Sequence, residues 1–302
     1  MSAVTMAIRR AWQGWDRAVY DRLYGGRKSR MTGVGPGRAL DDLPLQPTLL
    51  VVAHPDDEAL GAGGLLTRLA DTDIVIVTDG APTDGVAARA AGFAGNDGYR
   101  QARVRETTDA LALIGRGDVP VSRLGFPDQQ AVFHIPRIVS RLMEIMRAKK
   151  FRYVVTHPYE GGHPDHDATA LAVHAACFLL REDGFEAPLP VEMTSYHLAG
   201  GRMIYGAFLP APGAGPVETF AFDAGEQDRK QRMLQCYKTQ YRTLTEFPLD
   251  AERFRAAPSY DFLEPPHPGP LAYETFMWRM DGAGWRRAAG RALNRLGLLR
   301  PS

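Results

Sequence analysis

Residues 48–58 read TLLVVAHPDDE and set the first unit of the fold. The part TLLVVAH, residues 48–54, is a mostly apolar, β-branched run that ends at a proline, which is the pattern of a buried strand. Helical spacing follows over residues 58–70, where four leucines can share one face. A buried strand that passes directly into a helix predicts an α/β unit of a parallel sheet.

The alternation of apolar strand and helix continues to about residue 180. The glycine in Asp79-Gly80 is expected to stop the second strand. We expect that strand at residues 74–78, further strands at 121–126 and 153–156, and helices at 99–114, 135–147 and 166–180. This order predicts an α/β fold with a Rossmann-like, doubly wound, mostly parallel sheet and helices on both faces.

The pattern changes after about residue 185. Residues 191–198 and 217–222 are expected to be strands, and residues 226–244 a helix. Residues 247–270 are rich in proline and aromatic residues and receive no regular structure. These segments predict a C-terminal α+β elaboration of the sheet. The predicted organisation is a basic helical segment at 1–44, a main domain at 45–246, and a proline-rich segment with a basic helix at 247–302, packed on or beside that domain.

Composition places the chain among ordinary globular proteins. It has 302 residues, of which 45% are hydrophobic and 24% charged. Cys177 and Cys236 lie too far apart for a metal-binding pair, and two thiols give no disulfide framework. No apolar run reaches the roughly 18 residues of a membrane span, and the start lacks the pattern of a signal peptide. These features predict a cytoplasmic protein.

Charge is unevenly distributed although the net charge is only +1. Residues 1–31 and 285–302 each carry an excess of five positive charges, so the body between them is acidic. Basic ends on an acidic body argue against nucleic acid as a partner. Amphipathic patterns at residues 8–24 and 285–299 would suit peripheral contact with an anionic membrane. The other interpretation is that these helices pack on the domain or on each other.

The first cluster of reactive residues is Ala53-His54-Pro55-Asp56-Asp57-Glu58. It follows the first strand, at the sheet edge where open α/β folds bind ligands. His54 and Asp57 are three residues apart at a strand-to-helix turn, so both can reach one zinc-type ion. Asp56 would then point elsewhere and hold a water. The alternative is a capped helix start, with Pro55 in the turn and the carboxylates at the positive helix end.

The second cluster is His163-Pro164-Asp165-His166, in the loop after the strand at 153–156. The parallel sheet brings this loop to the same edge as the first cluster. His163 and His166 are three residues apart, so one can bind a metal while the other faces the substrate. His54, Asp57 and His166 together would supply three ligands and leave one position for water, which is typical of a catalytic metal site.

The two motifs resemble those of the PIG-L / LmbE-like family of zinc-dependent N-acetylglucosaminyl deacetylases. The resemblance covers about residues 45–245. It implies His54, Asp57 and His166 as ligands of Zn²⁺, with Fe²⁺ or another divalent ion as the alternative. It also implies Asp56 as the general base for the water that the metal activates, and His163 as the residue that stabilises the oxyanion or protonates the leaving amine. Asp165 is expected to pair with the His163 ring and to support its catalytic role.

Weaker correspondences imply substrate contacts. Arg103 matches an R-x-x-E feature, and Asp128 ends a GFPD loop whose acid would bind sugar hydroxyls. The segment from Lys230 to Gln240 resembles a K-(x)n-Y-x-x-Q feature of unassigned role. The mycothiol-type enzyme has a tyrosine two residues before the first histidine of HPDH, where this chain has Gly161. Tyr159, two residues further back, is its candidate replacement.

Other residues receive structural interpretations. His174 lies in an apolar helix and is expected to pack, while His157 is either structural or supports the metal site. His134 and His197 have no partner pattern, and His267 lies in a proline-rich surface loop. The stretch Gly61-Ala62-Gly63-Gly64 lacks phosphate-loop spacing and indicates close helix–strand packing.

The predicted function is metal-dependent hydrolysis of an N-acyl group, expected to be N-acetyl, on a small amino-sugar or glycoconjugate substrate. One rival is an amidase that acts on a larger acyl or thiol conjugate. Another is a non-catalytic sugar-binding module with a vestigial metal site. The intact Asp56 argues against the binding module, because binding alone needs no base beside the water.

Overall fold

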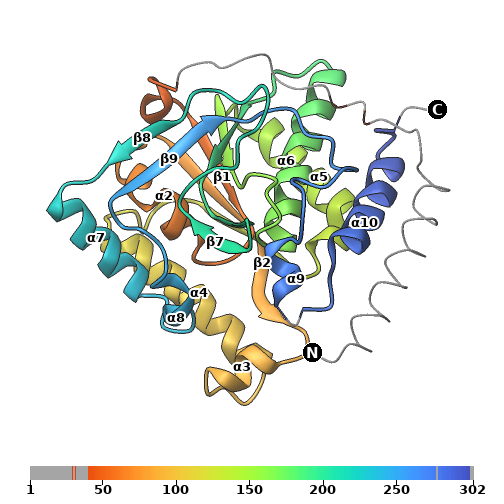
Figure 1. Cartoon of the computed structure of the whole chain (residues 1–302). Helices are drawn as coiled ribbons and strands as arrows, with labels where there is room; N and C mark the ends of the chain where they lie inside the picture. Colours follow the sequence, from red (N-terminus) through yellow and green to blue (C-terminus); the bar gives the residue numbers. More distant parts are fainter. Residues whose placement is uncertain (1–28, 30, 32–39, 277, 300–302) are drawn as a thin grey trace, which may run out of the picture.

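A seven-stranded sheet runs through the middle of the protein (Figure 1). The computed structural model describes residues 29, 31, 40–276 and 278–299. In chain order the elements are η1 (Leu43–Leu45), β1 (Thr48–Val52), α2 (Asp57–Arg68), β2 (Thr72–Pro82), α3 (Val86–Ala90), α4 (Asn96–Leu113), β3 (Val121–Asp128), α5 (Ala131–Ala148), β4 (Tyr153–Thr156), α6 (Pro164–Glu182), β5 (Leu189–Met193), β6 (Tyr196–Ala199), β7 (Arg202–Tyr205), β8 (Glu218–Ala221), α7 (Ala224–Gln235), α8 (Tyr241–Leu244), β9 (Ala251–Ala256), α9 (Ala272–Thr275) and α10 (Gly282–Arg295).

The order of the strands in the sheet is β3-β2-β1-β4-β5-β9-β8. The first five are parallel, and β9 pairs antiparallel with both β5 and β8. β1 lies at the point where the order reverses, because the chain adds β2 and β3 on one side of it and β4 and β5 on the other. The carboxyl ends of β1 and β4 therefore flank the crevice in which doubly wound folds bind ligands. This topology confirms the predicted fold class.

Alternate residues of β1 explain why the sheet is covered on both faces. Leu49 and Val51 belong to a core shared with α5, α6 and α10, whereas Leu50 and Val52 belong to a core shared with α2, α4 and α7. Figure 1 shows these two helical layers on opposite sides of the sheet. A strand buried on both faces has no solvent-exposed positions for polar residues, which is why residues 49–52 are apolar throughout.

The glycines of α2 let the helix approach its neighbours closely. A Cβ on Gly61 would lie 2.5 Å from the Met193 sulfur on β5, and one on Gly64 would lie 2.2 Å from the ring of Phe222. This contact confirms the interpretation of these glycines as packing residues.

Four sequence-based assignments need correction. β2 does not stop at Asp79-Gly80: Gly80 adopts a φ of 64° and the strand continues to Pro82. The single strand expected at 191–198 is divided at Thr194 and Ser195, where the chain leaves the main sheet for a two-stranded one. The helix expected at 226–244 is divided: α7 ends at Gln235, α8 begins at Tyr241, and Tyr237 in the segment between them is fully buried. Residues 247–270, left without structure, contain β9, which lies between β5 and β8 inside the sheet.

The apolar side of α10 packs on the domain. Trp285, Ala289 and Leu293 are fully buried, and the Trp285 indole donates a hydrogen bond to the Pro164 carbonyl at 2.9 Å. The amphipathic pattern at residues 8–24 lies outside the described residues. Within the part of the chain that is described, no helix combines the length and apolarity needed to cross a membrane.

The surroundings of His174 predict how the stability of the protein depends on pH. Its ring packs against Tyr260 and Phe262, and its Nε2 has no hydrogen-bond partner among the described residues. Burial, and then Arg181, lower the pKa of His174 from 6.5 to about 4. Between these values the unfolded chain binds more protons than the folded one, so acid in this window favours unfolding.

We expect the free energy of unfolding to fall less between pH 6.5 and 4.5 in His174→Phe than in the wild type. At ~1.4 kcal/mol per pKa unit, the difference is at most about 3 kcal/mol. Denaturant titrations at several pH values measure it. Parallel pH dependence of the two proteins would contradict the assignment.

Candidate active site

A cavity of about 230 Å³ opens at the carboxyl edge of the sheet, next to the ends of β1 and β4. Both motifs reach it, together with the end of β3. The sequence-predicted residues that line it are His54, Asp56, Asp57, Arg103, Asp128, His163 and His166. Asp165 and Tyr159 do not line it.

Asp57 lies between the two predicted histidine ligands. Its Oδ2 is 3.2 Å from His54 Nδ1, and its Oδ1 is 3.2 Å from His166 Nε2. Burial alone would raise the pKa of Asp57, but the rings of His166 and His157 hold it well below the usual value. A buried carboxylate that stays ionised between two imidazoles is a donor set that suits a divalent cation.

Each of the two histidines has a second partner on its far nitrogen. His54 Nε2 is 3.3 Å from the Asp165 carboxylate, and His166 Nδ1 is 3.3 Å from Ser195 Oγ. A proton on each far nitrogen leaves the nitrogen that faces Asp57 free to bind a cation. Ser195 was missed by sequence analysis because it lies in the short link between β5 and β6 and belongs to no motif.

The His157 ring stacks on His166 with ring centroids 3.9 Å apart. Its Nε2 accepts a hydrogen bond from the Ala53 backbone at 3.0 Å. Since this contact uses the nitrogen nearest Asp57, His157 supports the site by packing and by holding the end of β1. Of the two interpretations of His157, the structure favours support of the metal site over a structural role alone.

Three overlapping groups of side chains have ligand atoms close enough to hold one ion. They are His54, His163 and His166; His54, Asp128, His163 and Asp165; and Asp57, His157 and His166. Of the three predicted ligands, His54 and His166 belong to the first group, and Asp57 and His166 belong to the third. The geometry therefore brings the two motifs together.

Asp56 has an unusual backbone and a perturbed carboxyl group. Its φ is 126°, a conformation that residues with a Cβ rarely adopt, and its side chain makes no capping hydrogen bond to α2. Burial raises the pKa of Asp56 to about 6, with Arg103 opposing the rise. A carboxylate with this pKa is well matched to accept a proton near neutral pH.

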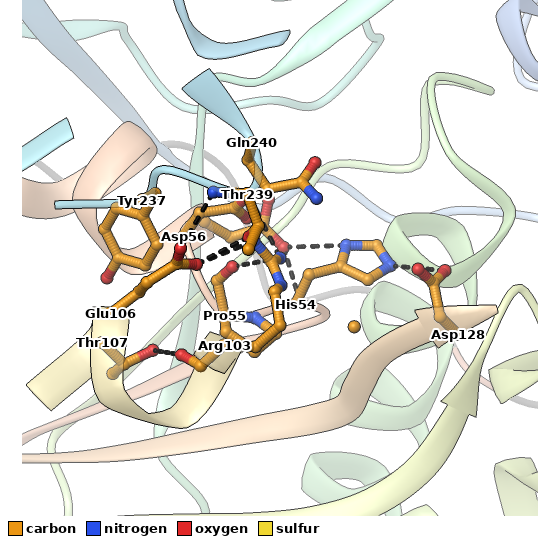
Figure 2. Close-up of polar contacts among 12 residues, drawn as sticks. His54, Pro55, Asp56, Arg103, Glu106, Thr107, Asp128, Tyr237, Thr239 and Gln240 are labelled. Carbon is orange, nitrogen blue, oxygen red and sulfur yellow. Dashed lines mark hydrogen bonds and ion pairs between the residues drawn. The ribbon is translucent and has the colours of Figure 1, made fainter. Parts of the chain in front are cut away.

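Arg103 is buried, with 2% of its surface exposed. Its Nη2 donates to Asp56 Oδ2 at 3.2 Å and to the Pro55 carbonyl. In Figure 2 its guanidinium lies beside Asp56 rather than in open space. The predicted substrate contact of Arg103 stays a prediction, whereas its hold on Asp56 is a feature of the structure.

His163 forms the N-cap of α6, where its Nδ1 accepts from the Asp165 backbone N–H at 3.1 Å. Burial, followed by the neighbouring rings of His54 and His166, lowers the pKa of His163 well below 6.5. The neutral ring then carries its proton on Nε2, which faces the cavity residue Asp128 at 3.8 Å. This nitrogen is available as a hydrogen-bond donor.

The expected pairing of Asp165 with the His163 ring is wrong. The Asp165 carboxylate accepts from the backbone N–H groups of Gln129 and Ala131, at 2.6 and 3.0 Å, and its Oδ2 faces His54. The first turn of α6 directs the side chain toward the loop after β3, so Asp165 orients His54. The carboxylate that pairs with His163 Nε2 is that of Asp128, at 3.8 Å, which also lies 3.4 Å from His54 Nε2 (Figure 2).

The prediction of Tyr159 as a substrate contact is also contradicted. Its ring stacks on Trp285, 5.3 Å between centroids, and its hydroxyl donates to the Glu264 carbonyl. This packing directs it into the core beneath α10. The aromatic residues that line the cavity are instead Tyr99, Tyr196, Phe247 and Trp278, which come from segments without a recognisable motif.

Comparisons with known proteins agree with this site. The family model for PIG-L (GlcNAc-PI de-N-acetylase) matches residues 49–177, a range that contains both motifs. A Bacillus cereus protein named probable N-acetyl-alpha-D-glucosaminyl L-malate deacetylase 2 is 35% identical over 130 residues, which cover 41% of this chain and 58% of that one. A Saccharopolyspora erythraea protein named 1D-myo-inositol 2-acetamido-2-deoxy-alpha-D-glucopyranoside deacetylase 2 is 31% identical over 166 residues, covering 47% and 59%. The chain spans less than two thirds of the length of these relatives.

Solved structures share the fold. A zinc-inhibited form of a teicoplanin deacetylase has a TM-score of 0.51 at 15% identity, over 71% of this chain and 99% of the other. The N,N'-diacetylchitobiose deacetylase of Pyrococcus horikoshii has a TM-score of 0.50 at 18% identity, over 73% and 87%. Fold and site together define an α/β domain with a His/Asp cluster at the switch point of the sheet. Residues 49–177 form a PIG-L family domain, which confirms the resemblance seen in the two motifs.

Proposed function

We propose that this protein is a metal-dependent N-deacetylase that hydrolyses the acetamide of a small amino-sugar or glycoconjugate. The observation that carries the proposal is the meeting of the two motifs: Asp57 contacts both His54 and His166, and Asp56 lies beside them in the same cavity. The names of the relatives, which are deacetylases of acetylated glucosamine compounds, support the substrate class.

His54, Asp57 and His166 are the proposed metal ligands, and Zn²⁺ is the proposed ion, with Fe²⁺ as the alternative. Two imidazoles and a carboxylate favour zinc over a hard cation such as Mg²⁺. A zinc ion bound there would lower the pKa of a bound water to about 7 and polarise the amide carbonyl.

The residues of this chain would carry the proton transfers. Asp56 accepts the proton of the attacking water, since its carboxylate lines the cavity and its pKa is raised to about 6. His163 Nε2–H donates to the oxyanion that forms when the carbonyl is attacked. The proton held by Asp56 can then pass to the nitrogen of the leaving amine, which completes the hydrolysis to acetate and a free amine.

An assay of acetate and amine release tests this function. Purified protein is incubated with N-acetylglucosamine glycosides that carry malate or inositol, and with their N-butyryl counterparts. We expect equal amounts of acetate and free amine, loss of both after chelation, and recovery when Zn²⁺ is restored. Cleavage of only the longer acyl group would favour the amidase. Binding of the sugars without release of acetate would instead support the non-catalytic module.

A further inference from the structure

The backbone of Asp56 is held in a conformation that residues with a Cβ rarely adopt. Asp56 and Gln129 are the two non-glycine residues with positive φ in the described part of the chain, at 126° and 65°. Such a conformation persists only where the surroundings fix it. The contacts that fix Asp56 therefore determine where its carboxylate points.

One set of contacts reaches the Asp56 backbone from the segment that follows α7. The Asp56 N–H donates to Glu58 Oε2 at 3.0 Å. The other oxygen of this fully buried carboxylate, Oε1, accepts from the hydroxyl of Tyr237, which is also fully buried. Tyr237 follows α7 directly, at the break that divides the helix expected at 226–244. The tyrosine thus orients the group that holds the Asp56 amide.

A second set reaches the Asp56 carboxylate from the same segment. Arg103 Nη2 is 3.2 Å from Asp56 Oδ2, and Arg103 Nη1 donates to Thr239 Oγ1 at 3.2 Å. Thr239 is itself held by Glu106, which accepts from its backbone N–H at 2.9 Å and from its hydroxyl at 2.7 Å. Figure 2 shows Thr239, Arg103 and Glu106 grouped around Asp56, with their polar contacts dashed.

The segment that supplies these residues is anchored at both ends. Lys230 Nζ donates to the Leu60 carbonyl at 2.7 Å and to Glu252 at 2.5 Å. Glu252 in turn accepts from the Gly64 N–H at 2.8 Å, across a kink in α2 at Ala62. At the other end, Gln240 Nε2 donates to the Tyr99 hydroxyl at 2.6 Å. In the K-(x)n-Y-x-x-Q pattern, Lys230 and Gln240 therefore anchor the two ends of this segment, and Tyr237 is the residue that contacts Glu58.

We propose that residues 230–240 form a positioning element for the general base, in which Tyr237 acts through Glu58 and Thr239 acts through Arg103. The proposal rests on the proposed function, in which Asp56 takes the proton of the attacking water. Neither Tyr237 nor Thr239 lines the cavity, so they act on the reaction only through other residues.

Tyr237→Phe removes the hydroxyl and keeps the ring. We expect kcat to fall about 10- to 100-fold, as for other groups that orient a catalytic site, with KM within about twofold and metal content unchanged. Tyr260→Phe is the matched control, because Tyr260 also donates to a buried glutamate, Glu192, at 2.5 Å, whereas among the described residues its hydroxyl makes no hydrogen bond with Glu58, Arg103 or Asp56. It should keep wild-type kcat.

The same substitution in an Asp56→Asn background separates positioning from a general structural effect. With the base absent, Tyr237→Phe should change the residual kcat by less than about twofold. Thr239→Val is the second variant and should also lower kcat without loss of metal. If Tyr237→Phe does not fold, the kcat of Thr239→Val tests the proposal in its place.

Hydrogen exchange gives a readout that does not depend on activity. We expect faster exchange in the peptide that contains Asp56 for Tyr237→Phe and unchanged exchange there for Tyr260→Phe. If the wild type releases no acetate but this difference is seen, the deacetylase function fails and the positioning role stands. Wild-type exchange and wild-type kcat in both Tyr237→Phe and Thr239→Val would overturn the proposal, as would an equal loss of kcat with and without Asp56.

Discussion

Asp56→Asn is expected to keep its metal and to lose ~10²–10⁴-fold in kcat, the usual contribution of a positioned general base. The amide has nearly the shape of the carboxylate and can still accept a hydrogen bond from Arg103, so the buried surroundings of Asp56 are retained. It cannot take a proton at neutral pH. The loss should therefore appear in kcat, with KM little changed.

Steady-state kinetics together with metal analysis of the purified variant measure this effect. Asp79→Asn is a suitable control, because Asp79 also lies at the carboxyl end of the sheet and pairs with an arginine, Arg100, at 2.6 Å but does not line the cavity. Near wild-type turnover in Asp56→Asn would contradict the assignment of Asp56 as the general base.

His163→Asn is expected to lower kcat by ~10²–10³-fold, the effect of losing one donor to an oxyanion. Asparagine is chosen because His163 is the N-cap of α6, and an asparagine side chain can accept the same backbone N–H. The shorter side chain does not reach the position of Nε2, so the cap is kept while the cavity donor is lost.

Thermal unfolding checks that the cap is retained, and kinetics measure the loss of turnover. His134→Gln serves as the control, since His134 stacks on Phe126 outside the cavity. A His163→Asn enzyme with unchanged kcat would show that the oxyanion is stabilised by other groups.

The sequence predicted the parallel part of the fold because local patterns specify it. Strands buried on both faces are rich in β-branched and aromatic residues, as in residues 153–156, YVVT, where prediction and structure coincide. β9 was missed because half of its residues, AERFRA, are charged and do not alternate regularly with apolar ones, within a stretch rich in prolines and aromatic residues. Two of its charged side chains, Glu252 and Arg255, are buried and paired, Arg255 with Glu192 at 2.7 Å, which no local pattern reveals.

The candidate site was predictable to the extent that its residues share a motif. His54, Asp57 and His166 meet because β1 and β4 are neighbours in a parallel sheet. The partners of Asp165 and Arg103 were not predictable, because they depend on the direction in which each helix presents its side chain. Tyr196 and Trp278 enter the cavity from short segments that only the folded chain brings near His166 and His163.

The central claim is that one divalent ion is bound by His54, Asp57 and His166. Metal content per chain, measured for the wild type, Asp57→Asn and His163→Asn after loading with Zn²⁺ and removal of the excess, tests it most directly. The account predicts about one zinc per chain in the wild type and in His163→Asn, and almost none in Asp57→Asn. Zinc retained by Asp57→Asn and lost from His163→Asn would contradict it, and would assign the ion to the three imidazoles of His54, His163 and His166 instead.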